Sequence, residues 1–352
     1  MGAHDKDVAT LIIEAAAHFD LGQFQDAVRL LSQALTLNSA CSELHLLRGA
    51  AYARMNEWTL ALADFDQYGD RYNNNPISLW CRGYCYQEQK NYARAIAEYD
   101  QAIKFAPNFY YAFYWRGITY QYLKNDQKAE SDLSTAIKLD RSNPLTYWTR
   151  ALTYSGQEQW EKVLGDSNQA ISVDPKYPRA YITKGVALEQ LGNSSEAILN
   201  FNKGVTLAPT DAYAYYSRGL YYRMHKKYKS AIADLAEAIK YNPRDPLSFC
   251  ARGSALVSDH QYVKAIFDCT QSLKLDPRRT HPRYSRGLAY SKIGFYKLAI
   301  DDFSEAIRIA PEYGEAFHER GLVYQALGQK ALAESDLEKA RQFGYSSPEA
   351  MR

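Results

Sequence analysis

The chain has 352 residues, and its 42 lysines and arginines nearly balance 40 aspartates and glutamates, for a formal net charge of +2. This balance does not favour a phosphate-binding track, so we do not expect nucleic acid as a partner. No stretch has the apolar length that crosses a bilayer, so we expect no membrane insertion.

Five cysteines are scattered along the chain without a pairing pattern, at positions 41, 81, 85, 250 and 269. An odd and unpatterned set of thiols fits a reducing compartment better than a disulfide framework. We therefore expect a cytoplasmic protein.

A small residue, in most cases a glycine that follows an arginine, returns every 34 residues. The column consists of Gly49, Gly83, Gly117, Ala151, Gly185, Gly219, Gly253, Gly287 and Gly321. Extending the register back to Ala15 gives ten repeats over residues 8–347, with an N-terminal extension at 1–7 and a C-terminal tail at 348–352. A fixed period of this length is typical of stacked two-helix units.

The repeat over residues 212–245 shows the predicted elements in chain order. Tyr215, Gly219 and Tyr222 recur at helical spacing, and a short polar turn follows. A second amphipathic run ends at Pro243, because proline cannot continue a helix. Each repeat is therefore predicted to be a helix, a tight turn, a second helix and a break.

Small residues stand on both predicted helices of nearly every repeat, as in the pairs Gly83 with Ala95 and Gly219 with Ala231. Glycine inside a helix costs about 1 kcal/mol relative to alanine, so its recurrence indicates a packing reason. We expect the two helices to approach closely at this column, with large aromatic residues filling the space around it.

These aromatic, glycine, alanine and proline columns resemble the tetratricopeptide repeat family over essentially the whole chain. The resemblance implies an all-α fold, a right-handed superhelical α-solenoid of antiparallel helix pairs, with the first helix of each pair lining a concave groove. It also implies recognition of proteins or peptides, as in scaffolds, co-chaperones and assembly factors.

Repeat two ends unusually, because Tyr68 and Gly69 replace the alanine and aliphatic residue found elsewhere, and Pro76 follows three asparagines. These changes predict a looser or redirected stack. We therefore expect a hinge near residues 68–76.

An arginine before the small residue is followed sixteen residues later by an acid in eight repeats. The pairs are Arg48 with Asp64, Arg82 with Glu98, Arg116 with Asp132, Arg150 with Asp166, Arg218 with Asp234, Arg252 with Asp268, Arg286 with Asp302 and Arg320 with Asp336. Repeat six changes both members together, to Lys184 and Asn200. We predict structural ion pairs that fix the hairpin register; the alternative is a basic track for an acidic ligand.

The other stripe of the first helices carries a surplus of aromatic and arginine residues, which are enriched at energetic centres of interfaces. The candidate groove residues are Trp80, Tyr84, Tyr111, Tyr114, Tyr122, Trp148, Arg179, Tyr213, Tyr216 and Arg223. Two interpretations stay open: the rings face a bound peptide, or they pack against the first helix of the adjacent repeat.

The resemblance also brings a known binding mode that can be checked by position. The chaperone-tail carboxylate clamp uses lysines and asparagines, whereas the matching positions here carry Trp80, Cys81, Tyr84, Tyr114 and Ile118. We therefore expect no such clamp, and instead a protein or peptide with hydrophobic anchors.

No phosphate loop, dinucleotide fingerprint or nucleophile elbow is present, so we expect no enzyme and no cofactor. Cys81 and Cys85 could form half of a metal site, but no second pair accompanies them, so we expect no metal. The leading hypothesis is a non-enzymatic peptide-binding scaffold or adaptor. The alternative is a structural subunit of a multiprotein assembly that associates through repeat edges and termini, including self-association at an incompletely capped C-terminal end.

Overall fold

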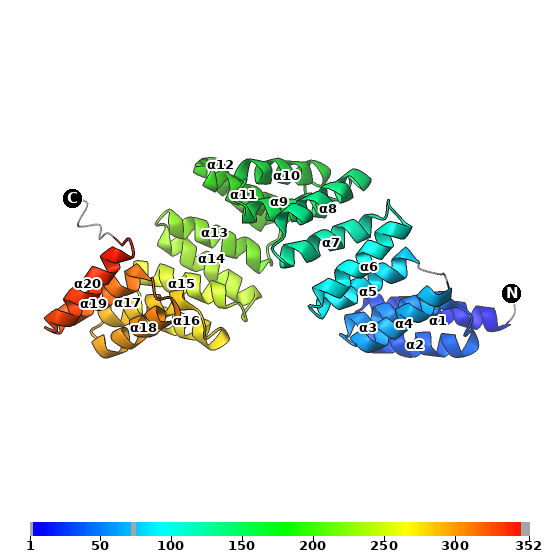
Figure 1. Ribbon diagram of the computed structural model, residues 1–352, viewed down its shortest axis with the longest axis horizontal. Coiled ribbons are helices and arrows are strands. Elements are labelled where there is room, and N and C mark those ends of the chain that lie inside the picture. Colours follow the sequence, from blue (N-terminus) through cyan, green and yellow to red (C-terminus); the bar gives the residue numbers. More distant parts are fainter. Residues whose placement is uncertain (1–2, 72–74, 346–352) are drawn as a thin grey trace. The chain divides into compact units, whose positions relative to one another are not determined.

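The computed structural model describes residues 3–71 and 75–345, and this part of the chain contains twenty α-helices and no strand (Figure 1). Consecutive helices pack in antiparallel pairs joined by tight turns. The chain divides into two compact units after Tyr177. None of the described helices combines the length and apolarity that crossing a membrane requires.

The first unit contains five hairpins, which stack in chain order. Their helices are α1 (Ala3–Asp20), α2 (Phe24–Leu37), α3 (Ser42–Arg54), α4 (Trp58–Arg71), α5 (Pro76–Glu88), α6 (Tyr92–Phe105), α7 (Tyr110–Tyr122), α8 (Asp126–Leu139), α9 (Pro144–Gly156) and α10 (Trp160–Val173). The second helix of each hairpin packs against the first helix of the next.

The second unit contains the other five hairpins in the same arrangement. Its helices are α11 (Pro178–Gln190), α12 (Ser194–Leu207), α13 (Ala212–Met224), α14 (Tyr228–Tyr241), α15 (Pro246–Ser258), α16 (Tyr262–Leu275), α17 (Thr280–Lys292), α18 (Tyr296–Ile309), α19 (Gly314–Ala326) and α20 (Lys330–Gln342). The predicted fold class, an all-α solenoid of antiparallel helix pairs, is confirmed.

The turn inside each hairpin places one residue in the left-handed backbone region, and these residues recur every 34 positions. They are Gly22, Asn56, Lys90, Lys124, Glu158, Gly192, Lys226, His260, Gly294 and Gly328. A left-handed residue is a frequent way to end a helix and reverse the chain. Glycine adopts it without strain, whereas the six other residues accept some strain to keep the turn tight.

The small-residue column lies where the two helices of a hairpin meet. A Cβ atom added to Gly83 would stand 2.5 Å from Cε1 of Tyr99, a fully buried ring on α6. At Gly117 it would stand 2.9 Å from Cγ of Leu133. The glycines therefore remain because a large apolar side chain of the second helix occupies the space beside them.

The domain boundaries predicted from the repeat register do not coincide everywhere with the ends of the observed helices. α1 begins at Ala3, so the backbone is already helical in residues 3–7, which the repeat register assigns to an extension. The tail 348–352 lies outside the described residues. So do residues 72–74 of the predicted hinge. Gly69 lies in α4, and an added Cβ there would be 2.8 Å from Oγ of Ser78 on α5, so these helices are closely packed. The hinge near 68–76 stays a prediction.

The C-terminal end of the second unit is partly covered by residues after α20. Phe343 packs on Phe317 with ring centroids 5.6 Å apart, and Tyr345 packs on His318 at 4.7 Å. The exposed positions of α20 are mostly charged or polar, as in a capping helix, while Leu337 remains partly exposed.

The close approach at the glycine column can be tested with two glycine-to-alanine changes inside helices of the first unit. We expect Gly83→Ala to destabilise the protein by about 1–3 kcal/mol, because the new methyl group overlaps Tyr99. Gly165→Ala in α10 is the control, since nothing lies within 4 Å of its added Cβ, and it should stabilise by about 0.5–1 kcal/mol. Urea denaturation of both variants checks the sign, and equal effects would refute the packing explanation.

Candidate functional site

Each predicted arginine–acid pair is in direct contact across its hairpin. In the α7–α8 hairpin, Nε of Arg116 donates to Oδ2 of Asp132 at 2.7 Å, and Nη2 donates to Oδ1 at 2.7 Å. The Arg150–Asp166 and Arg218–Asp234 pairs have the same two-pronged geometry, and both guanidinium donors of Arg82 bond one oxygen of Glu98. The planar guanidinium matches the carboxylate, so the contact fixes the register of the two helices.

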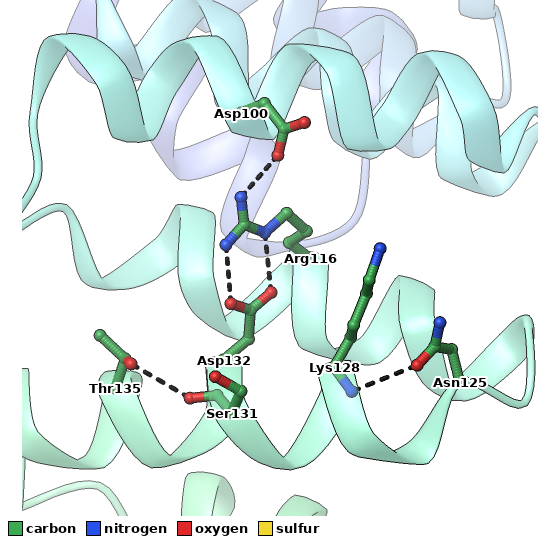
Figure 2. A network of polar contacts seen from close by, with 7 residues as sticks. All are labelled: Asp100, Arg116, Asn125, Lys128, Ser131, Asp132 and Thr135. Atoms are coloured by element: carbon green, nitrogen blue, oxygen red, sulfur yellow. Dashed lines mark hydrogen bonds and ion pairs between the residues drawn. The ribbon is translucent and has the colours of Figure 1, made fainter.

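The same arginines also reach backward to the preceding hairpin, a contact that sequence reasoning missed. Nη1 of Arg116 donates to Oδ1 of Asp100 on α6 at 2.5 Å, and Figure 2 shows this arginine between Asp100 and Asp132. Equivalent acceptors sixteen residues before other arginines are Ser32, Asp66, Ser134, Asn202, Thr270 and Ser304. The sequence does carry a signal for this contact: polar residues recur at 34-residue spacing, in most repeats, sixteen positions before the arginine.

These pairs are largely buried. The side chain of Arg116 is 18% exposed and that of Asp132 only 8%. Burial alone would lower the pKa of Arg116, but the hydrogen bonds and charges of Asp132 and Asp100 more than offset it and raise that pKa above its ordinary value. In seven of the eight repeats the arginine donors are engaged on both sides, which leaves little of the ladder open to an acidic ligand.

Repeat six lacks this arrangement. Nζ of Lys184 lies 3.6 Å from a carboxylate oxygen of Glu196, and the amide of Asn200 donates to the backbone carbonyl of Glu196. In the described structure, Lys184 and Asn200 therefore turn to the same residue of α12 instead of to each other.

The candidate groove residues fall into three groups by exposure. Tyr111, Tyr122 and Tyr213 are 48%, 60% and 40% exposed, and Arg179 is also exposed. Trp80, Tyr84, Trp148, Tyr216 and Arg223 are partly buried. Tyr114 is buried, at 6% exposed. All ten lie on first helices or at their start, but they do not form one uniform wall.

Ring contacts join the aromatic residues of α5 and α7. The rings of Trp80 and Tyr111 lie 5.0 Å apart, and those of Tyr84 and Trp115 lie 5.1 Å apart. Tyr114 instead shares a hydrogen bond with Thr149 of α9, 3.2 Å between the hydroxyl oxygens. The two interpretations thus apply to different residues: Tyr114 packs between repeats, while Tyr111 rests on Trp80 with half of its surface open.

An exposed apolar column runs along the second position of the first helices. It consists of Ile77 and Tyr111 in the first unit and of Tyr213 and Leu247 in the second. Within each unit the two members are one 34-residue repeat apart. We call these four residues the exposed first-helix column.

The cysteines of α5 are poor metal ligands. Burial raises the pKa of Cys81 to about 12 and that of Cys85 to about 12. A thiol binds a metal as the thiolate, so burial disfavours the required form. No group of three metal-ligating side chains occurs among the residues that the structure describes.

Comparison with protein-family models identifies the family of this chain. Tetratricopeptide repeat models match residues 14–76, 76–109, 110–143, 178–211, 212–245, 281–313 and 314–340. The chain belongs to the tetratricopeptide repeat (TPR) family. Together, these matches extend through both compact units, and the boundaries of several agree with the 34-residue register read from the sequence.

Solved structures that are similar to this chain include the following three. MamA is 22% identical, with 45% of this chain and 93% of that chain covered and a TM-score of 0.42. YrrB, described as a TPR protein with an unusual peptide-binding site, is 21% identical, with coverage of 53% and 96% and a TM-score of 0.44. A chain of the APC/C hetero-tetramer Cut9-Hcn1 is 12% identical, with coverage of 98% and 95% and a TM-score of 0.53, a likeness of fold alone. No curated protein matches the chain.

The two contacts of the ladder arginine can be separated by mutation. We expect Arg116→Ala to destabilise by up to about 3 kcal/mol, because Asp132 would keep a buried, unpaired carboxylate. Asp100→Ala should cost less than about 1 kcal/mol, since Asp100 is half exposed and Arg116 keeps its partner on α8. Thermal melting of both variants checks the order, and equal melting temperatures would contradict it.

Repeat six offers the reverse experiment, in which the missing pair is installed. Asn200→Asp alone should lower the melting temperature, because it places an acid at a nearly buried site without an arginine. Adding Lys184→Arg should recover the loss and stabilise the hairpin further, with a coupling of about 1–3 kcal/mol. The double-mutant cycle measures that coupling, and strict additivity would show that the two positions do not pair.

Proposed function

We propose that this TPR protein is a non-enzymatic scaffold or adaptor that binds a protein or peptide with hydrophobic anchors on its first helices. Membership of the family supports protein interaction in general. The exposed first-helix column carries the specific proposal, because it places large apolar side chains in solvent at the same position of successive repeats. Isolated exposed apolar residues need no explanation, but a periodic set on one helix position does.

The rings of this surface are held in place before any ligand arrives. Tyr111 contacts Trp80 and lies 5.2 Å, ring to ring, from Tyr110. Tyr122, a candidate groove residue outside that column, stacks on Tyr92 at 5.6 Å with nearly parallel planes. Side chains that are already ordered lose little entropy on binding, so their contact surface contributes more fully to affinity.

A second candidate is a structural subunit that associates through the second helices. On α16, Val263 and Phe267 are one helical turn apart and both exposed. Phe267 also lines a cavity of about 380 Å³ together with Ile232 and Leu256. Val263 and Phe267 are on the second helix of their hairpin, whereas the exposed first-helix column is on first helices, so the two functions can be tested separately.

The two candidates predict opposite outcomes in affinity capture from cell extract followed by mass spectrometry. The double variant Tyr111→Ala/Tyr213→Ala should lose specific partners at least about tenfold, because aromatic hot spots contribute about 2 kcal/mol or more each. Phe267→Ala should retain them. Both changes remove exposed rings, so circular dichroism should show unchanged helicity. Loss of partners with Phe267→Ala alone would favour the structural subunit and refute the leading proposal.

A further inference from the structure

In several hairpins the ladder arginine has a tyrosine ring on one side and an oxygen atom on the preceding hairpin. In α19, Cζ of Arg320 lies 5.8 Å from the ring centroid of Tyr324, and Nη1 donates to Oγ of Ser304 at 2.8 Å. The other pairs with the tyrosine four residues after the arginine are Arg48 with Tyr52, Arg150 with Tyr154 and Arg218 with Tyr222. A ring and an oxygen atom therefore cover the guanidinium group in these hairpins.

The α15–α16 hairpin has neither of these two contacts. Leu256 stands where the tyrosine would be, and Ala236 on α14 stands where the oxygen atom would be. Arg252 keeps its two bonds to Asp268, from Nε at 2.7 Å and from Nη2 at 2.8 Å. Its Nη1 makes no hydrogen bond with another described residue and is not sealed from solvent, since the side chain is 21% exposed. One guanidinium donor is therefore open.

A cavity of about 380 Å³ lies beside this arginine. Arg252 lines it, and Leu256, Ile232 and the exposed ring of Phe267 give it apolar walls. All of its lining residues belong to the second unit. Ligand sites in proteins typically have volumes of about 300–1,000 Å³, so a cavity at the lower end of this range suits a small molecule.

The charged groups of the cavity favour an anion. They are Arg252, Lys264 and Asp268, and the side chain of Asp268 is only 2% exposed and already accepts two bonds from the arginine. Nζ of Lys264 donates to Oε1 of Gln261 at 2.8 Å, which leaves two of its N–H donors. The neighbouring acid Asp259 accepts from Nε2 of Gln261 at 2.6 Å. A ligand would therefore meet two cations and little opposing negative charge.

We propose that this cavity binds a small aromatic carboxylate. Its ring takes the place of the missing tyrosine beside the guanidinium group, a favourable cation–π arrangement. Its carboxylate accepts from Nη1 of Arg252 and from Lys264, as the carboxylate of Asp66 accepts from Nη1 of Arg82 at 2.8 Å in the first unit. No residue of the exposed first-helix column lines the cavity, so this site goes beyond the proposed function.

The probe is 4-hydroxyphenylacetate, which carries the ring of tyrosine and a carboxylate. NMR titration with the full chain should give a Kd of about 1 mM or below, as expected for a ligand of this size. The neutral 4-hydroxyphenylacetamide keeps the ring and should bind about tenfold more weakly or worse. Cyclohexylacetate keeps the charge without the aromatic ring and should also bind more weakly, because it forms no cation–π contact.

Three variants locate the site. Ala236→Asp/Leu256→Tyr restores the residue types of other hairpins, so it should lose probe binding at least about tenfold without a lower melting temperature, because the chain's own ring and carboxylate fill the cavity. Lys264→Gln should weaken binding about threefold or more. Lys203→Gln is its matched control, since it removes the same charge from an exposed site on α12 of the same unit and should bind as the wild type.

Several results would overturn this inference: no binding by the wild type, equal affinities for the acid and the amide, or undiminished binding by Ala236→Asp/Leu256→Tyr. A lowered melting temperature of that double variant would show that the cavity is not the space of the missing tyrosine, and would also overturn it. Equal weakening by Lys264→Gln and Lys203→Gln would do the same, because it would indicate only long-range attraction. The proposed function is tested apart from this, through Tyr111 and Tyr213.

Discussion

The arginine before the glycine column connects three helices, and the regular stacking within each unit depends on it. Its guanidinium group bonds an acid on the second helix of its own hairpin and, in most repeats, a polar residue on the preceding hairpin. The neighbouring small residue lies close to that acid: a Cβ on Gly117 would stand 3.4 Å from Cβ of Asp132, the arginine's own partner. The close approach of the two helices at this small residue brings the acid within hydrogen-bond distance of the planar guanidinium group.

The sequence was sufficient for the parts of the fold that depend on spacing along one hairpin. Helix pairs, turns and the sixteen-residue spacing between arginine and acid all follow from local periodicity. Because the pattern occurs in ten copies, a departure in one repeat does not hide it. The contact from Arg116 to Asp100 could not be derived in the same way, because it depends on how consecutive hairpins stack. Tyr111 and Tyr114 mark another limit: both are tyrosines on one helix, yet the hydroxyl of Thr149 and the packing around it bury only Tyr114.

Chemical variety in this chain is concentrated at positions that the repeat leaves free. The glycine and ion-pair columns keep their chemistry in most repeats, where they hold the two helices of a hairpin together. The position occupied by Gln87, Gln121 and Arg223 has no such constraint. In the first unit it is used for polar contacts between repeats. In the second unit Arg223 stands at this position and Ala255 takes the place of the threonine that each glutamine contacts, so the same contact is not repeated there.

The exceptions in the ladder show that its two contacts can be lost separately. Arg252 keeps its bond to Asp268 but meets Ala236 at the place of the backward acceptor, and the second unit continues through it. Loss of the backward hydrogen bond alone therefore does not end a stack. In repeat six, both Lys184 and Asn200 depart from the pattern, and the boundary between the units falls directly before this hairpin. A lysine carries a single ammonium group instead of a planar fork, so it cannot reproduce the two-sided contact. The bond within a hairpin and the bond to the preceding hairpin are therefore separate contacts, and either can be absent from a hairpin that still folds.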